Sequence, residues 1–164
     1  MENNTAQKHL VGVSDMKVSA NEGDIIVTHS LGSCIGVTIY DPKANVGGML
    51  HYQLPSSDCR PERAAENPCM FADTGLPALF KSAYRLGAEK KRLVVKVAGG
   101  SNVMDKTGFF QIGRRNYISL KKILWKNGVL IAAEDIGGDS WRTMKLEIGT
   151  GRVLIKNGSG EFEL

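Results

Sequence analysis

The sequence predicts an α+β fold, a layered sandwich of mainly antiparallel β-sheet with two helices packed on one face. Eight short segments have the composition of β-strands, and only two longer segments show helical spacing. The expected order is four strands, a helix, a strand, a helix and three strands, whereas a doubly wound parallel sheet would alternate strands and helices throughout. The 19 glycines favour the many turns that such short strands require.

The first four strands are expected over residues 10–20, 25–28, 34–40 and 46–54. Residues 21–24 (NEGD) and 41–45 (DPKAN) separate them, because Asn, Gly and Asp-Pro favour turns. The segment HSLGS (29–33) interrupts the β pattern between the second and third strands. After Pro55, the polar residues 56–68 form a long loop, and ordered loops of that length often serve a function.

Two helices are expected from apolar residues at helical spacing. The apolar face of the first helix consists of Leu76, Leu79, Phe80, Ala83 and Leu86. The second helix runs from about Arg114 to Asn127. Gly87 and Gly128 suit the position that follows a helix end. The remaining strands are expected over residues 93–98, 129–135, 141–148 and 152–156.

The length of 164 residues suits one domain, which we expect over residues 9–164 after a disordered N-terminal tail of residues 1–8. No stretch approaches the roughly 20 apolar residues that cross a bilayer. The N-terminal residues also lack the basic and apolar pattern of a signal peptide. We therefore expect a cytoplasmic protein without membrane insertion.

The net charge of +4 comes from basic residues in short, scattered groups. A nucleic-acid site would combine a long basic run with aromatic residues, and the sequence has no such run. We therefore expect no nucleic-acid partner. A solvated charged face is the simplest interpretation, and an acidic protein partner would suit this charge as well.

The three cysteines are Cys34, Cys59 and Cys69. An odd number without an export signal argues against a disulfide framework. Cys59 and Cys69 lack the CxxC spacing of a structural zinc site. The sequence therefore indicates neither a metal nor another cofactor, and it directs attention to Cys34.

Cys34 and His51 are candidates for a catalytic pair because of the hairpin in which they lie. If the turn is centred between Pro42 and Lys43, Cys34 lies directly opposite His51. Opposed residues share a face of the sheet, with Cβ atoms about 4.5–5.5 Å apart. A change of register by one residue would separate the faces. The prediction therefore depends on the turn.

The chemistry of these residue types fits a cysteine hydrolase. A thiolate is the nucleophile, and an imidazole can take the thiol proton and later return it to a leaving group. The backbone N–H groups of Gly32, Ser33 and Cys34 could stabilise an oxyanion. The hydroxyl of Thr28 could orient the imidazole by accepting its N–H. The alternative for each residue is structural, since a lone cysteine is often a small buried apolar residue.

Several motifs resemble one family, the chemoreceptor glutamine deamidases called CheD. The resemblance extends from about Val11 to Lys156. Its motifs are LGSC (31–34), YDP (40–42), GGM (47–49), HYQLP (51–55), KVAGGSNVM (96–104), IGRRN (112–116), DIGG (135–138), Arg142 and Thr150-Gly151.

The resemblance implies a nucleophile at Cys34, a base at His51 and a third catalytic residue at Thr28. It also implies the reaction, in which a thiolate attacks a receptor glutamine, ammonia leaves and water releases glutamate. Gly99 and Gly100 are further candidates for oxyanion binding or substrate positioning. The implied partners are the cytoplasmic helices of chemoreceptors as substrate and a CheC-type phosphatase. The alternative function is a non-catalytic adaptor that binds both.

The sequence departs from the family pattern beside two of these motifs. Ala98 and Ser101 flank the Gly99-Gly100 pair, where phenylalanine and alanine are usual. Trp141 stands before Arg142, where glycine is common. We expect these positions to lie in or near loops that face the substrate.

Overall fold

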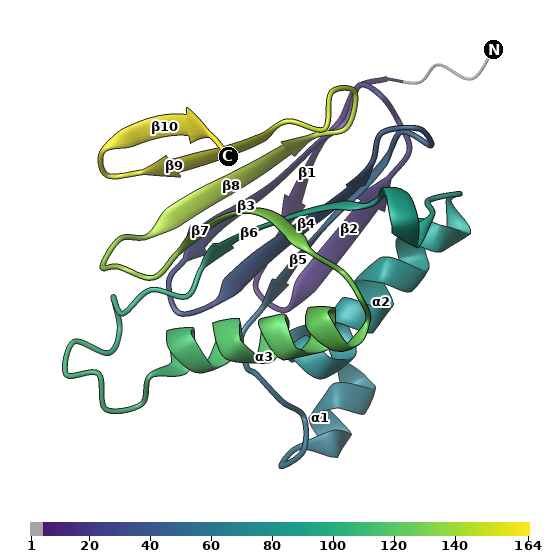
Figure 1. Ribbon diagram of the computed structural model, residues 1–164. Coiled ribbons are helices and arrows are strands. Elements are labelled where there is room, and N and C mark those ends of the chain that lie inside the picture. Colours follow the sequence, from purple (N-terminus) through teal and green to yellow (C-terminus); the bar gives the residue numbers. More distant parts are fainter. Residues whose placement is uncertain (1–4) are drawn as a thin grey trace.

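The computed structural model describes residues 5–164, which form two five-stranded sheets and a layer of helices (Figure 1). We call the sheet with the order β1-β3-β8-β9-β10 the outer sheet; it contains β1 (Lys8–Val11), β3 (Ile25–Leu31), β8 (Arg142–Glu147), β9 (Val153–Asn157) and β10 (Gly160–Glu163). We call the sheet with the order β2-β5-β4-β6-β7 the central sheet; it contains β2 (Asp15–Ser19), β4 (Ile35–Asp41), β5 (Val46–Tyr52), β6 (Val94–Gly99) and β7 (Ile131–Ile136). The helices are α1 (Pro61–Glu66), α2 (Ala72–Arg85) and α3 (Ile112–Lys126), with 3-10 turns η1 (Pro68–Met70) and η2 (Lys90–Arg92).

The central sheet lies between the outer sheet and helices α2 and α3. One of its faces packs in an apolar core with the helices, and the other packs in an apolar core with the outer sheet. Along β5 the side chains alternate as strand geometry requires. Leu50 and Tyr52 pack in the core shared with the helices, whereas Met49 packs in the core between the sheets. Residues on the same side of β5 as Met49 therefore face the outer sheet.

The predicted fold class is confirmed. Most strand pairs are antiparallel, the exceptions being the parallel pairs β1–β3 and β6–β7. The two long helices lie on one side of the central sheet (Figure 1). Several details differ from the prediction. Helix α1 forms inside the expected loop 56–68, and β10 was missed because all four of its residues are exposed and show no apolar alternation.

The predicted first strand, residues 10–20, is two strands in two sheets. A turn at residues 12–14 separates β1, which pairs with β3, from β2, which pairs with β5. The predicted tail of residues 1–8 also extends too far, since Lys8 begins β1 and the Gln7 N–H donates to Asp24 at 3.1 Å. Residues 1–4 lie outside the described residues.

The predicted register of the β4–β5 hairpin is wrong by two positions. His51 pairs with Gly36, and the turn covers residues 42–45. The cause is Asp41, whose carboxylate accepts hydrogen bonds from the N–H groups of Lys43 and Ala44 at 2.9 and 3.1 Å. The loop is therefore longer than a turn centred between Pro42 and Lys43. A shift by two positions keeps each side chain on the predicted face.

Asp41 is fully buried and also joins the hairpin to η2. Its carboxylate accepts the N–H of Glu89 at 2.9 Å and forms an ion pair with the Arg92 guanidinium at 2.8 Å. Burial alone would raise the pKa of Asp41, but the guanidinium and the backbone N–H groups hold this pKa well below its usual range.

We expect the Asp41→Ala substitution to lower the free energy of unfolding by about 3 kcal/mol, because Arg92 loses its buried partner and the turn amides lose their acceptor. Urea denaturation measures this loss. The control is Arg152→Ala, which breaks a half-exposed ion pair with Glu163 at 3.2 Å and should cost less than about 1 kcal/mol. Equal losses in the two variants would contradict the role of Asp41.

Candidate active site

The chain crosses from the outer sheet to the central sheet through residues 32–34, which connect β3 to β4 and which we call the Cys34 loop. All three carbonyl groups of this loop are held by distant segments. The N–H groups of Ser101 and Gly100 donate to the first and third carbonyls at 2.8 and 2.9 Å. The side-chain amide of Asn116 donates to the second at 2.9 Å. The Cys34 loop is therefore fixed by the segment that follows β6 and by α3.

The amide groups of Ser33 and Cys34 differ from the carbonyls. Within the part of the chain that the structure describes, their N–H groups donate to no other residue. Two such N–H groups, next to a thiol, have the chemistry of an oxyanion-binding site.

Gly99 and Gly100 position the Cys34 loop. Gly99 has a φ of +112°, and a Cβ atom added there would lie 2.2 Å from the Cys34 carbonyl oxygen, so only glycine fits. The N–H of Gly100 already donates to that same carbonyl. The structure therefore brings both predicted glycines to Cys34, where the amide of Gly100 is not free to bind an oxyanion.

His51 and Thr28 connect the two sheets. The Thr28 hydroxyl on β3 and the His51 Nδ1 on β5 are 2.7 Å apart, and both side chains are fully buried. His51 lies two residues after Met49 and thus on the side of β5 that faces the outer sheet. The other ring nitrogen, Nε2, is buried and has no hydrogen-bond partner among the described residues.

Cys34 lies on the same side of the central sheet as His51. Its half-buried side chain packs against the core between the sheets. It precedes by two residues Gly36, the partner of His51 in the hairpin. Diagonal neighbours of this kind are about 7–8 Å apart in an antiparallel pair, and Gly36 places no side chain between them. The thiol and the free Nε2 thus share one layer at one end of the hairpin.

Burial controls the protonation of both groups. It raises the pKa of the Cys34 thiol to about 11, and the residue's own backbone N–H opposes this shift only in part. It lowers the pKa of His51 to about 4. At neutral pH the resting site therefore holds a neutral thiol and a neutral imidazole. The imidazole is in the state that can accept a proton.

Asn116 belongs to the site, although no role was predicted for it. It is fully buried, and its side-chain amide bridges the carbonyls of Ser33 and Gln53 at 2.9 and 2.8 Å. It thus joins the Cys34 loop to the end of β5. The sequence contains a signal for this role, because Asn116 occupies the buried helical stripe that continues with Leu120 and Leu124. A polar residue in an apolar stripe indicates a specific hydrogen-bonding task.

Trp141 and Val103 cover one side of the Cys34 loop. A Cβ atom added to Gly32 would lie 2.7 Å from the Trp141 ring and 2.9 Å from the Val103 side chain. The two residues also line a hollow together with residues 105–108. Trp141, which departs from the family pattern, is 49% exposed. It therefore presents part of its ring to the surface beside the Cys34 loop.

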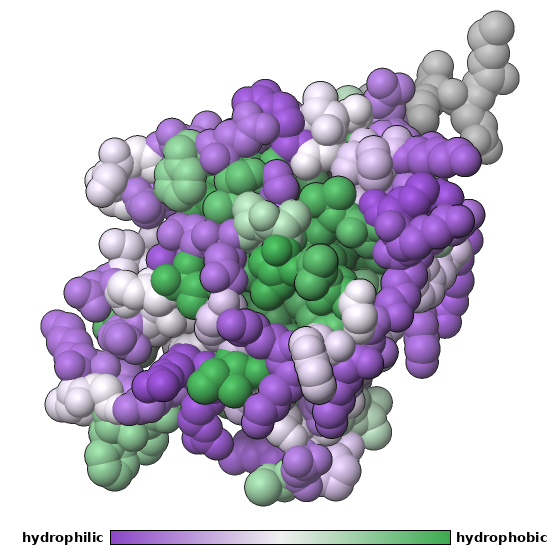
Figure 2. All heavy atoms as spheres, in the orientation of Figure 1, coloured by the Kyte–Doolittle hydropathy of each residue, from purple (hydrophilic) through white to green (hydrophobic). Residues whose placement is uncertain are grey.

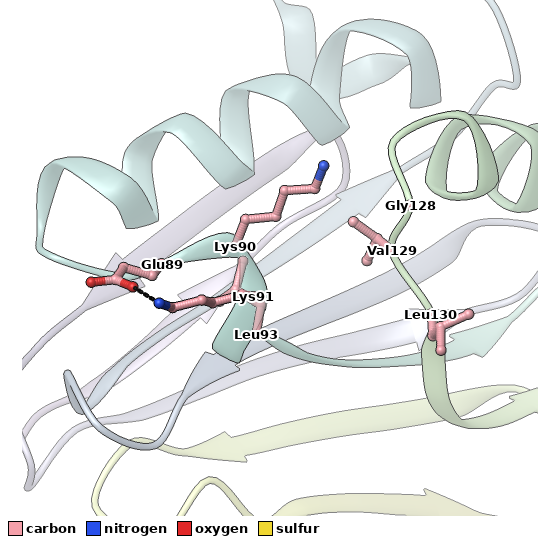
Figure 3. Close-up of a pocket in the computed structure, with 7 residues that line it drawn as sticks. All are labelled: Glu89, Lys90, Lys91, Leu93, Gly128, Val129 and Leu130. Atoms are coloured by element: carbon pink, nitrogen blue, oxygen red, sulfur yellow. Dashed lines mark ion pairs between the residues drawn. The ribbon is translucent and has the colours of Figure 1, made fainter.

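Two other surface features lie apart from this site. Figure 3 shows a hollow between η2 and the segment that joins α3 to β7, with an ion pair of Glu89 and Lys91 at 3.5 Å. Cys34, His51 and Thr28 do not line it. Figure 2 shows apolar residues near the middle of the face that Figure 1 presents, above α3, with hydrophilic residues around them. The residues that line the hollow in Figure 3 include no cysteine or histidine.

The described residues contain no group of three or more His, Cys, Asp or Glu side chains that could hold a metal ion. None of the helices in residues 5–164 is long and apolar enough to span a membrane.

Fold and site together define a two-sheet α+β domain with a thiol, an imidazole and a hydroxyl at the crossover between its sheets. A family model described as "CheD chemotactic sensory transduction" matches residues 53–157. The chain belongs to the CheD family.

Similar proteins come from several organisms. The chain is 54% identical to "Probable chemoreceptor glutamine deamidase CheD 1" of Syntrophus aciditrophicus, covering 92% of this chain and 94% of that protein. It is 50% identical to "Probable chemoreceptor glutamine deamidase CheD" of Solibacter usitatus, covering 94% of this chain and 92% of that protein. A solved Neisseria meningitidis structure of the DUF152 family has a TM-score of 0.47 and 10% identity, covering 80% of this chain and 62% of that one.

We expect Gly99→Ala to lower the free energy of unfolding by about 3 kcal/mol, because the new Cβ atom collides with the Cys34 carbonyl. The matched control is Gly87→Ala, with a similar φ of +101° but nothing within 4 Å, which should cost about 1 kcal/mol. Chemical denaturation compares the two. Equal costs would show that backbone conformation alone requires glycine at position 99.

The lowered pKa of His51 makes stability depend on pH. Above about pH 6.5 the imidazole is neutral in both the folded and unfolded chain, and its contribution is complete. As pH falls towards 4, His51 is protonated in the unfolded chain but stays neutral in the folded chain, so the free energy of unfolding decreases. Between pH 7 and 4.5 we expect wild type to lose about 2 kcal/mol more than His51→Gln, measured by urea denaturation. Parallel pH profiles would contradict this.

Proposed function

We propose that this chain is a glutamine deamidase of chemoreceptors, with Cys34 as nucleophile, His51 as general base and Thr28 as the residue that orients His51. One observation supports this above all others. Thr28 holds Nδ1 of His51 at 2.7 Å and leaves Nε2 unpartnered in the layer that contains the Cys34 thiol. The family membership and the names of the relatives agree with this chemistry.

The first half of the reaction forms a thioester. As the Cys34 sulfur attacks the carbon of the glutamine carboxamide, Nε2 of His51 takes the thiol proton. Because the resting thiol and imidazole are neutral, this transfer accompanies the attack. The tetrahedral intermediate collapses when the imidazolium protonates the nitrogen, ammonia leaves, and an S–C bond remains between enzyme and substrate.

The second half releases the product. His51 takes a proton from water as the water oxygen attacks the thioester carbon. The C–S bond breaks, the proton returns to sulfur, and a glutamate side chain leaves. The enzyme is regenerated without any oxidant or cofactor.

The Cys34 loop supplies the oxyanion site in this proposal. The N–H groups of Ser33 and Cys34, which donate to no other residue in the described structure, are the donors for the developing negative charge. Because three hydrogen bonds fix the carbonyls of the loop, these donors need little reorganisation during the reaction. Gly99 and Gly100 act as positioning residues that hold Cys34.

The proposed substrates are the cytoplasmic helices of chemoreceptors, and the proposed place of action is the cytoplasm. Each turnover converts a neutral carboxamide into a carboxylate and so changes the charge pattern of the receptor helix. The proposed protein partner is a CheC-type phosphatase.

We expect Cys34→Ala to abolish deamidation, and His51→Gln to reduce it by about 100-fold or more, because each removes one partner of the proton transfer. Mass spectrometry of purified receptor cytoplasmic domains measures the increase of about one mass unit for each deamidated glutamine. The control is Cys59→Ser, which replaces an exposed thiol and should leave the rate unchanged. Deamidation by Cys34→Ala would refute the proposal.

The adaptor alternative makes a different prediction for the same variant. Binding of Cys34→Ala to receptor domains and to a CheC-type phosphatase can be compared with that of wild type in pull-down experiments. If Cys34→Ala restores signalling in cells that lack the wild-type protein, the adaptor role is the principal one. Loss of signalling with retained binding supports the deamidase.

A further inference from the structure

Strand β1 contributes one backbone group to the site. It lies at the edge of the outer sheet, beside β3 (Figure 1). Its last residue, Val11, is 2% exposed and pairs with Thr28. The Val11 carbonyl oxygen and the Thr28 hydroxyl oxygen are 2.7 Å apart. Thr28 therefore has two partners at hydrogen-bond distance, the Val11 carbonyl and Nδ1 of His51.

The positions of the hydrogens in this series of hydrogen bonds, from Val11 through Thr28 to His51, follow from counting donors. A carbonyl oxygen can only accept, and a threonine hydroxyl has one hydrogen. Two oxygens at 2.7 Å require a hydrogen between them, so the Thr28 hydrogen points to Val11. The short contact between Thr28 and His51 must then contain the hydrogen of Nδ1. The neutral ring has only that one N–H, and Nε2 therefore carries a lone pair.

We infer that the Val11 carbonyl, acting through Thr28, sets the tautomer of His51, so that β1 is a positioning element of the active site. The inference rests on the proposed role of His51 as the base, because that role needs the lone pair on Nε2. With the opposite tautomer, Nε2 would present a buried N–H without an acceptor among the described residues and could take no proton from Cys34.

The other end of β1 is anchored by a cluster around Asp24. The Asp24 carboxylate accepts hydrogen bonds from Nε2 of His9 at 2.7 Å and from the Gln7 N–H at 3.1 Å. It also accepts the hydroxyl of Ser19 at 2.7 Å. Together with the parallel pairing from Lys8 to Val11, these bonds fix the strand along its length. The Val11 carbonyl is thus held in place from outside the catalytic residues.

The direct test is ¹⁵N NMR of the unaltered chain labelled at histidine, at pH 7. His51 is assigned by comparison with His51→Gln. We expect a protonated nitrogen at Nδ1 and an unprotonated nitrogen at Nε2. A proton on Nε2 would overturn the inference. Because this measurement does not involve substrate, the inference can fail while deamidation by Cys34 stands, and the reverse also holds.

A truncation tests the role of β1. A chain that begins at Gly12 lacks the Val11 carbonyl, whereas a control chain that begins at Thr5 keeps β1. We expect the control to match wild type in tautomer and kinetics. The shorter chain should populate both tautomers, and its kcat should fall about tenfold with little change in KM, because the ring loses its fixed tautomer and orientation. An unchanged tautomer and kcat would overturn the inference.

Substitution of Thr28 tests the connection without removing a strand. Thr28→Ser keeps a hydroxyl with both partners, and we expect wild-type tautomer and kcat within about threefold. Thr28→Val keeps the shape and removes both hydrogen bonds, and we expect mixed tautomers and the same loss of kcat as in the truncated chain. If Thr28→Val retains the Nδ1 hydrogen, the tautomer does not depend on Thr28 and the inference is wrong. These spectra remain decisive if the truncated chain does not fold.

Discussion

The hydrogen bond between Thr28 and His51 is the contact on which the candidate site depends. It joins the outer sheet to the central sheet, and apolar residues such as Met49 and Met144 pack in the same core. A buried hydrogen bond of 2.7 Å requires a specific geometry, so this bond contributes to the alignment of the two sheets. The same bond fixes the ring of His51. One contact therefore contributes both to the alignment of the sheets and to the orientation of the His51 ring.

The surroundings of Cys34 show how polar groups are organised around that bond. The Cys34 loop is held by Gly100, Ser101 and Asn116, and all three of its carbonyls are satisfied. The buried side-chain N and O atoms without a hydrogen-bond partner among the described residues are Nε2 of His51, Oγ of Ser101 and Oδ1 of Asn116. All three residues belong to the site or contact its loop. Buried side-chain polar atoms without a partner are therefore concentrated around the Cys34 loop.

Local patterns in the sequence predicted the layers, the helices and the shared face of Cys34 and His51. Side-chain alternation in strands has a period of two, so an error of two positions in the hairpin kept the face correct. The error arose from Asp41, whose bonds to turn amides and to Arg92 no local pattern reveals. Likewise, the contact of Thr28 with His51 requires the two sheets to stack, and the role of Asn116 requires α3 to dock. Both contacts depend on tertiary structure, which the periodicity of the sequence does not reveal.

The hydrogen bonds that hold the Cys34 loop also determine the stage of folding at which the candidate site forms. Its anchors lie far along the chain, since Asn116 is 83 residues away from Ser33. During synthesis Cys34 emerges long before the residues that hold its loop, and contacts between residues so far apart in the sequence form slowly. A nascent or partly unfolded chain therefore has the cysteine without the competent geometry. In the proposed mechanism, deamidation therefore has to wait until helix α3 has docked and Asn116 holds the Ser33 carbonyl.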